Sequence, residues 1–140
     1  SREILFLYQE AHKNISFSCL EQTPIPVFSF DAEQIKRCLI NLLDNAVAVL
    51  PDGGTIAIEL SLDNEQENVF IKVHDDGPGI SKENKLKLFE PYFSTKKTGT
   101  GLGLAIVSTI VSDHNGYIRV QDNKPTGSVF IIELPLLNRQ

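Results

Sequence analysis

The sequence predicts one α/β domain, a two-layer sandwich in which a mixed, mainly antiparallel sheet carries helices on one face. Three observations support this fold class. The chain has 140 residues, the size of a single domain, and 41% of them are hydrophobic, enough for one core. Segments of alternating hydrophobicity are interspersed with segments of helical periodicity. Neighbouring strands are mostly joined by short polar turns, so most pairs are expected to be antiparallel.

The first elements expected are a short helix over residues 2–12 and two short strands. Apolar residues of the helix recur at helical spacing; they are Ile4, Tyr8 and Ala11. Residues 15–20 alternate in hydrophobicity as a strand does, and a proline-rich turn leads to a second short strand at residues 27–30.

A long helix is expected from Asp31, a favourable N-cap, to about Leu50, where a Pro-Asp-Gly-Gly sequence stops it. Its apolar stripe comprises Ile35, Leu39, Leu42, Leu43, Ala46 and Leu50. Asn41 and Asn45, one turn apart, share a different face. Because asparagine is unfavourable inside helices, the pair indicates a function, such as presenting oxygen ligands to a hydrated Mg²⁺. Two exposed polar residues without a function are the alternative.

The second half of the chain predicts two hairpins and two helices around a long connection. The expected elements are strand 55–62, strand 69–75, helix 82–89, helix 101–114, strand 117–121 and strand 128–134. Asn115-Gly116 is a helix C-cap signal. The connection over residues 77–100 is long for a compact domain, and loops of that length are usually functional.

An Asp-Asp-Gly-Pro-Gly sequence ends the strand over 69–75. Asp75 has the parity of the apolar residues of that strand, so it is expected to face the core, whereas His74 faces away and is structural or exposed. A core-facing carboxylate is unfavourable unless a donor meets it. An exocyclic amine is a suitable donor, and Gly77 and Gly79 would let a flat ring approach the backbone.

A third signal is the Gly-Thr-Gly-Leu-Gly sequence at residues 99–103, which opens a helix. Glycines there leave backbone N–H groups available at the positive end of the helix dipole, a ready phosphate site. The sequence has no Walker-A Lys-Ser/Thr ending and no strand directly before it, which excludes P-loop and Rossmann sites. Between Gly79 and Gly103, five lysines against two glutamates give a formal charge of +3, which suggests a local anion site, with a solvated charged loop as the alternative.

Composition narrows the possible functions. The formal net charge of −5 argues against a dedicated nucleic-acid binder. The longest apolar runs are too short for a transmembrane helix, and no signal peptide is recognisable. Cys19 and Cys38 are far apart and lack metal-ligand spacing, so reduced thiols are expected instead of a disulfide or a zinc site.

Four segments, in order, resemble the N, G1, F and G2 boxes of the sensor histidine kinase ATP-binding domain. They are NLLDNA at 41–46, DDGPGI at 75–80, LFEPYF at 88–93 and GTGLGL at 99–104. That domain belongs to the GHKL superfamily, with gyrase, Hsp90 and the MutL ATPases, and the resemblance covers almost the whole chain. It implies the Bergerat ATP-binding fold. Residues 45–54 and the Phe-Ser-Thr-Lys at 93–96 look most like nitrogen-regulation-type sensor kinases.

The resemblance implies that the chain binds ATP with Mg²⁺. Asp75 would accept the adenine amine, and Asn45 would bind the Mg²⁺ that bridges the phosphates, with Asn41 near the phosphate end. Lys96 or Lys97 would neutralise the γ-phosphate; Asn41, Asn45 and Lys96 are the expected catalytic residues. The other nucleotide-binding positions implied are Gly77, Gly79, Ile80, Phe89, Phe93, Thr98, Gly99, Thr100, Gly101, Leu102, Gly103 and Leu104.

Residues 80–100 would form a lid over the nucleotide, hinged by Gly99, Gly101 and Gly103. Phe89 and Phe93 are expected to anchor this lid, with ordinary core packing as the alternative. Ala48 and Val49 depart from many relatives, which have a lysine and an aromatic residue there. This departure shifts the expected phosphate contacts onto the lid lysines.

Asn41 separates the enzyme classes within this resemblance. Hydrolytic relatives have a glutamate there as general base, and an amide cannot take that proton. The chain is therefore better suited to holding ATP for an external nucleophile, which in the family is a histidine on a separate dimerisation domain. His12, His74 and His114 lack the sequence context of that histidine, so residues 1–140 are expected to form the catalytic domain alone.

The implied protein is a bacterial protein-histidine kinase. Its expected partners are its own dimerisation and phosphoacceptor domain and a response regulator, and the full-length protein is expected to be a homodimer. This domain would be cytoplasmic without contacting membrane or nucleic acid, in a parent protein that is either membrane-anchored or free. The isolated chain would bind ATP without autophosphorylating. Two alternatives stay open: a GHKL-type ATPase clamp fragment, and a signalling module that binds nucleotide or a partner without catalysis.

Overall fold

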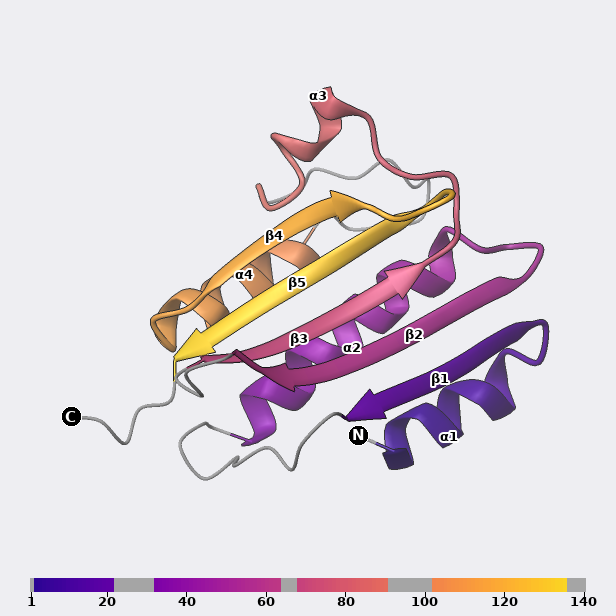
Figure 1. Ribbon diagram of the computed structural model, residues 1–140, viewed down its shortest axis with the longest axis horizontal. Coiled ribbons are helices and arrows are strands. Elements are labelled where there is room, and N and C mark those ends of the chain that lie inside the picture. The colour runs from indigo at the N-terminus through magenta and orange to yellow at the C-terminus, as the bar shows by residue number, and fades with distance from the viewer. Residues whose placement is uncertain (1, 22–31, 64–67, 91–101, 136–140) are drawn as a thin grey trace.

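The computed structural model describes residues 2–21, 32–63, 68–90 and 102–135 (Figure 1). Its elements, in chain order, are α1 (Arg2–Ala11), β1 (Ile15–Glu21), α2 (Ala32–Ala48), β2 (Gly54–Leu62), β3 (Asn68–Asp75), α3 (Lys82–Lys85), α4 (Gly103–Asp113), β4 (Tyr117–Asp122) and β5 (Ser128–Pro135). The described strands form a five-stranded sheet of order β1-β2-β3-β5-β4. β1 pairs parallel with β2 and the other neighbours pair antiparallel, so the predicted mixed, mainly antiparallel sheet is confirmed.

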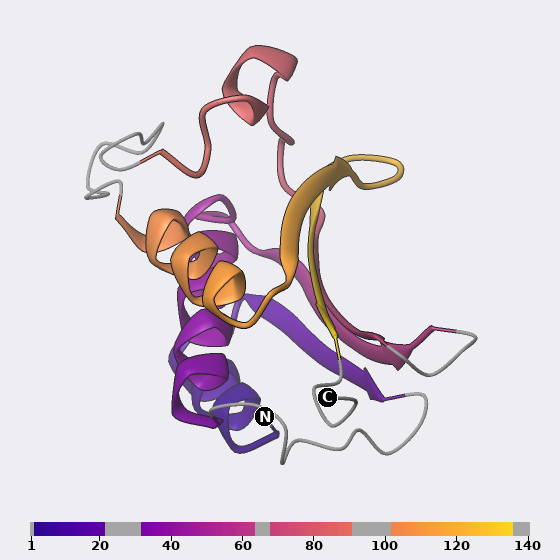
Figure 2. The ribbon, with the colours of Figure 1, turned by 90° about the vertical axis from the view of Figure 1, so that its left-hand side faces the viewer.

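The helices α1, α2 and α4 cover one face of this sheet, as Figure 2 shows. The core lies between the two layers, where the apolar stripe of α2 meets the inward side chains of the central strands. Its most deeply buried members include Leu42, Leu43, Ile56, Ile58, Val73, Val107, Ile132 and Leu134. The expected two-layer sandwich is therefore what the chain forms.

Most predicted elements agree with the structure to within one or two residues, but the N-terminal helix and the helix over 82–89 need correction. In α1, Ala11 is exposed and Leu5 is buried beside Ile4, because the helix turns Leu5 toward the core. α3 ends at Lys85 after a Ser81 cap, and Leu88 then turns into the core. The predicted strand at 27–30 and the Asp31 cap lie outside the described residues.

The C-terminal end of α4 and the two cysteine side chains agree with what the sequence predicts. Asn115 has a left-handed φ of 63°, and the Gly116 N–H donates to the Val111 carbonyl at 2.9 Å, which closes the helix end. Cys19 and Cys38 are both free thiols. Within the described ranges, no helix has both the length and the hydrophobicity needed to cross a bilayer.

β3 is the strand that positions the candidate site. It lies between β2 and β5, and its residues alternate strictly between buried and half-buried positions. The buried face ends with Asp75, as the parity predicts. His74 points to the opposite face, where its Nε2 lies within hydrogen-bond distance of the Glu59 Oε1, at 3.2 Å.

Candidate functional site

Asp75 is a buried carboxylate at the carboxyl end of β3. It is only 3% exposed, and its backbone lies between Ile56 of β2 and Ser128 of β5. Its Oδ1 accepts a hydrogen bond from the Gly77 N–H at 3.0 Å. A strongly polar acceptor is thus fixed at the edge of an apolar core, where it can receive a donor from a ligand.

The electrostatics of Asp75 are dominated by its burial. Burial raises the pKa of the Asp75 carboxyl above its usual value, because the charged form loses hydration. Hydrogen bonds from the backbone of Gly77 and Ser128 lower the pKa, the neighbouring Asp76 raises it and His74 lowers it. The carboxylate is therefore held in a state that an additional donor would stabilise.

The turn between β4 and β5 clamps the backbone of Asp75 and Asp76. The Asn123 side chain donates to the Asp75 carbonyl at 2.8 Å, and the Thr126 hydroxyl donates to the Asp76 carbonyl at 3.3 Å. Gly127 has a φ of +106°, and a Cβ there would lie 1.9 Å from the Asp75 carbonyl oxygen. Only glycine fits this contact.

Sequence reasoning missed this clamp. Residues 123–127 carry ordinary turn signals, and nothing local indicates that the turn lies against a segment about 50 residues earlier in the chain. The contact exists because β5 pairs with β3, with Ser128 opposite Asp75.

The end of α2 lies beside Asp75. A Cβ added to Gly77 would be 3.2 Å from the Asp75 Oδ1 and 3.1 Å from the Val49 side chain. The Asp75 carboxylate and the Val49 side chain therefore both lie next to Gly77. Val49 directly follows α2 and comes one helical turn after Asn45. The structure therefore brings the asparagine-bearing helix and the buried acid, about 30 residues apart, to the same end of the sheet.

Asn41 lies beside the N-terminus of α4. Its amide nitrogen donates to the Arg37 carbonyl at 3.0 Å, and its Oδ1 would be 3.3 Å from a Cβ at Gly103. α4 begins at Gly103, and its N-cap, Leu102, provides no side-chain hydrogen bond to the first turn. The backbone N–H groups at the N-terminus of α4, the positive end of its dipole, thus lie next to the asparagine face of α2, which carries Asn41 and Asn45.

The side-chain oxygens at this site suit a hydrated Mg²⁺ only if a phosphate group supplies further ligands. Among the described residues there is no group of three or more His, Cys, Asp or Glu side chains that could hold a metal. Asn45 is half-buried on α2, one turn beyond Asn41. Mg²⁺ commonly binds through one or two protein oxygens together with substrate phosphates and water, so this set fits a nucleotide-bound cation.

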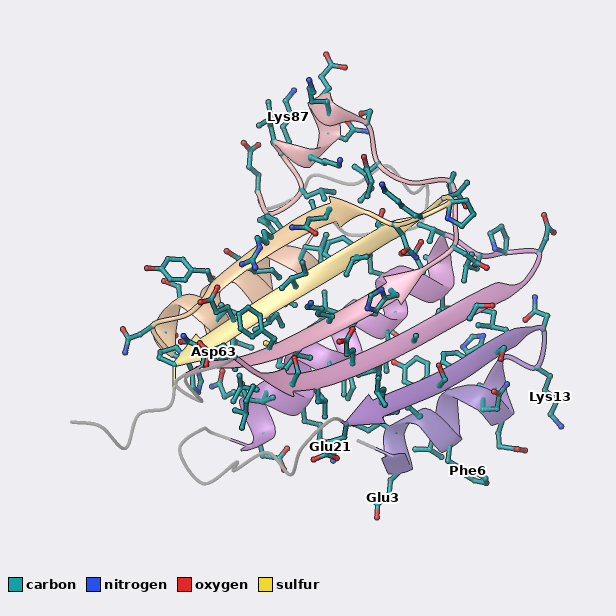
Figure 3. All side chains as sticks on the ribbon, viewed as in Figure 1. Glu3, Phe6, Lys13, Glu21, Asp63 and Lys87 are labelled. Carbon is teal, nitrogen blue, oxygen red and sulfur yellow. The ribbon has the colours of Figure 1, made fainter. Side chains whose placement is uncertain are left out.

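The segment after the Asp75 turn is anchored on the β4–β5 hairpin. Phe89 packs edge-on against Phe130 with ring centroids 6.4 Å apart, and Leu88 is buried. The Lys85 Nζ lies 2.6 Å from the Asp122 Oδ1, whereas Lys87 projects away from the sheet (Figure 3). In this structure the Phe89 ring packs against the domain core.

Other expected site residues are partly described. Gly79 takes a φ of +86°, as a turn glycine should, and Ile80 and Leu104 pack against the core. The remaining expected positions lie outside the described residues; they are Phe93, Lys96, Lys97, Thr98, Gly99, Thr100 and Gly101.

Comparison with known proteins identifies the family. Residues 30–138 match the family described as histidine kinase-, DNA gyrase B- and HSP90-like ATPases. The chain belongs to this family. Its match includes every described residue of the site, and the ATPase domain of this family binds ATP.

Curated relatives of this ATPase domain are named as kinases. Sporulation kinase E of Bacillus subtilis is 40% identical over 112 residues, which cover 80% of this chain and 15% of the kinase. The sensory histidine kinase/phosphatase NtrB of Rhodobacter capsulatus is 36% identical over 121 residues, covering 79% of this chain and 34% of NtrB. The chain thus spans a minor part of these relatives. NtrB among them agrees with the nitrogen-regulation-type resemblance of the sequence.

Solved structures place the domain within the histidine kinases. The catalytic domain of histidine kinase ThkA superposes with a TM-score of 0.85 and 36% identity, covering 96% of this chain and 90% of that one. Full-length ShkA in complex with AMPPNP gives 0.84 and 28% identity, over 96% of this chain and 28% of ShkA. ThkA in complex with the response regulator TrrA gives 0.82 and 33% identity, over 99% of this chain and 40% of that one. The chain is a histidine kinase ATP-binding catalytic domain.

Proposed function

We propose that this catalytic domain binds ATP with Mg²⁺ and donates the γ-phosphate to a histidine on a separate dimerisation domain. A response-regulator aspartate would then take the phosphoryl group. The observation that carries this proposal is the juxtaposition of the buried Asp75 carboxylate with the end of α2, the helix that presents Asn41 and Asn45. A nucleotide that spans these groups would have its base at Asp75 and its phosphates at the asparagine face.

Asp75 would select adenine. Its carboxylate accepts the exocyclic amine, whereas guanine would present a carbonyl oxygen to the same acceptor. Gly77 and Gly79 add no side chains of their own beside the carboxylate, which suits the approach of a flat ring. A hydrogen bond to an ionised acceptor is worth about 1.5–3 kcal/mol, enough to dominate the choice of base.

The asparagine face and the start of α4 would hold the phosphates. Asn45 would supply an oxygen ligand to Mg²⁺, which when bound offsets the charge that develops on the transferred phosphoryl group. The N-terminus of α4, adjacent to Asn41, would direct its amide dipoles at the phosphates. Lys96 or Lys97 would neutralise the γ-phosphate.

Asn41 makes the domain a phosphate donor and not a hydrolase. Its amide already donates to the Arg37 carbonyl and cannot remove a proton from water. Bound ATP would therefore react with an external nucleophile and not with water. The complexes of ShkA with AMPPNP and of ThkA with TrrA support a nucleotide and a response regulator as the ligands of this domain. Both ligands belong to the bacterial cytoplasm, where we place the domain, in a homodimeric parent kinase.

Calorimetric titration of the chain with ATP, with and without Mg²⁺, tests the binding half of the proposal. We expect MgATP to bind more tightly than ATP with EDTA, and MgGTP to bind much more weakly. A chain that shows no heat with either adenine nucleotide would instead be a partner-binding module.

Phosphotransfer is tested by mixing the chain with a separately expressed dimerisation helix pair from a related kinase and labelled ATP. We expect label on the histidine of the helix pair, none on the chain itself, and slow ATP hydrolysis by the chain alone. Rapid hydrolysis without the helix pair would identify an ATPase clamp and overturn the role of Asn41.

A further inference from the structure

Tyr8 of α1 contacts α2, the asparagine-bearing helix. The Tyr8 hydroxyl donates a 2.5 Å hydrogen bond to the Asp44 Oδ1, and its oxygen lies 3.5 Å from the Ile40 carbonyl oxygen. α1 precedes residues 30–138, which carry the match to the family. The contact therefore joins an element outside the family match to the helix that bears the nucleotide-site asparagines.

The Tyr8 ring contacts two other rings. It stacks near His12 with ring centroids 6.0 Å apart and meets Phe17 of β1 at 6.1 Å. Phe6 on the same helix is 64% exposed and projects away from the domain (Figure 3). Tyr8, which contacts α2, is thus packed against the domain, in contrast to Phe6. Its hydroxyl therefore has a fixed position.

The hydroxyl of Tyr8 is a permanent donor. Burial raises the pKa of the Tyr8 hydroxyl, and the hydrogen bond to Asp44 and the negative charge of that carboxylate raise it further. An O–H donor that meets a carboxylate at this distance forms a strong, charge-assisted bond. The bond therefore fixes where the negative charge of Asp44 resides.

Asp44 lies at the edge of the asparagine face. At about 100° per residue, it is about 60° around the helix from Asn41 and directly precedes Asn45. Ile40, whose carbonyl also lies near the Tyr8 oxygen, is on the side of Asp44 away from Asn41. Tyr8 thus draws the carboxylate around α2 toward α1.

We propose that Tyr8 is a positioning residue for the nucleotide site: it holds the Asp44 carboxylate on the α1 side of α2, away from the asparagine face. This inference rests on the proposed function, in which the triphosphate and its cation bind at that face. A carboxylate released from Tyr8 can turn toward the phosphates, where it repels them or competes for Mg²⁺. Because Asp44 is exposed, releasing it leaves no buried charge without a partner.

The test compares Tyr8→Phe with Tyr117→Phe, a matched control at a tyrosine that is 70% exposed on β4. Tyr8→Phe keeps the packed ring and removes only the hydroxyl. We expect it to weaken MgATP binding about threefold to tenfold, the effect of one charge several ångströms from the phosphates near a protein surface. MgADP, which carries less charge, should lose less, and Tyr117→Phe should bind both nucleotides as the wild type does.

Two further measurements separate positioning from simple docking of α1. In the Tyr8→Phe/Asp44→Asn double variant, MgATP affinity should return to that of Asp44→Asn alone, because no charge is left to misplace. The penalty of Tyr8→Phe should also shrink in about 1 M salt, where the Debye length is about 3 Å. A penalty that persists in both experiments, or equal binding by Tyr8→Phe and Tyr117→Phe, overturns the inference. Failure of the wild type itself to bind MgATP would contradict the proposed function, on which this inference rests.

Discussion

The Asn123 side-chain amide donates a 2.8 Å hydrogen bond to the backbone carbonyl of Asp75, joining residues 48 positions apart. The same amide accepts from the Lys124 N–H through its oxygen, at 2.9 Å. The amide oxygen of Asn123 therefore bonds within its own turn, and the amide nitrogen bonds to the carboxyl end of β3. The residue that would recognise adenine is thus fixed by a distant turn as well as by its own strand.

Replacing Asn123 tests this clamp. Asn123→Ala should lower the free energy of unfolding by about 0.5–1.5 kcal/mol, the usual value of one such hydrogen bond. Asn123→Asp should cost more, about 1–3 kcal/mol, because a carboxylate oxygen then faces the Asp75 carbonyl oxygen. Urea denaturation checks the order of the two variants. Equal stability of Asn123→Asp and wild type would show that the contact is not formed in solution.

Gly127 and Gly79 provide a matched pair of turn glycines. Both have positive φ, but a Cβ at Gly127 would lie 1.9 Å from the Asp75 carbonyl oxygen, whereas at Gly79 the nearest atom is 3.5 Å away. Gly79→Ala should cost about 1–2 kcal/mol in backbone strain alone. Gly127→Ala adds a backbone clash and should cost on the order of 2–5 kcal/mol. Thermal or urea unfolding that ranks them in reverse contradicts the geometry.

Asp75→Asn should weaken ATP binding roughly 10–150-fold, through loss of a hydrogen bond to a charged acceptor. It should also narrow the preference for ATP over GTP, because an amide can donate to the guanine carbonyl. Calorimetry with both nucleotides measures this effect. The control is Asp113→Asn, at an exposed residue that ends α4, which should leave both affinities unchanged.

The same substitution should stabilise the nucleotide-free chain at neutral pH. Burial raises the pKa of Asp75, so the folded state binds this proton more tightly than the unfolded chain does. As pH rises from the ordinary carboxyl pKa through the raised one, the wild type loses stability relative to Asp75→Asn, and the difference is constant above that window. Melting temperatures of both proteins between about pH 3 and pH 7 check this. A difference that does not change with pH would mean that the carboxylate is not strained by burial.

Phe89 and Lys85 both attach the segment after α3 to the β4–β5 hairpin, by different forces. Phe89→Ala removes the half-buried ring that meets Phe130 and should cost roughly 1–3 kcal/mol. Lys85→Ala removes an ion pair with the exposed Asp122 and should cost about 0–1 kcal/mol. Hydrogen exchange over residues 82–90 should rise clearly in Phe89→Ala and little in Lys85→Ala. The reverse order would assign the anchoring to the ion pair.

The sequence by itself determined most of the helices and strands and the buried position of Asp75. Alternation in β3 placed Asp75 on the buried face, and helical periodicity placed Leu42 and Leu43 in the core, as found. These patterns are local, because side-chain direction repeats every two residues in a strand and every 3.6 in a helix. Asn41 and Asn45 were likewise recognisable from their spacing on α2 and from the family boxes.

Only the tertiary structure decided what surrounds these residues. Pairing of β5 with β3 brings Gly127 and Asn123 onto Asp75, and packing of α1 against α2 brings Tyr8 to Asp44. Such contacts join positions 36 to 52 residues apart, and no local periodicity encodes them. They are set by which strands pair and which helices share a face, so the side chains that fix the site in place become visible only in the folded chain.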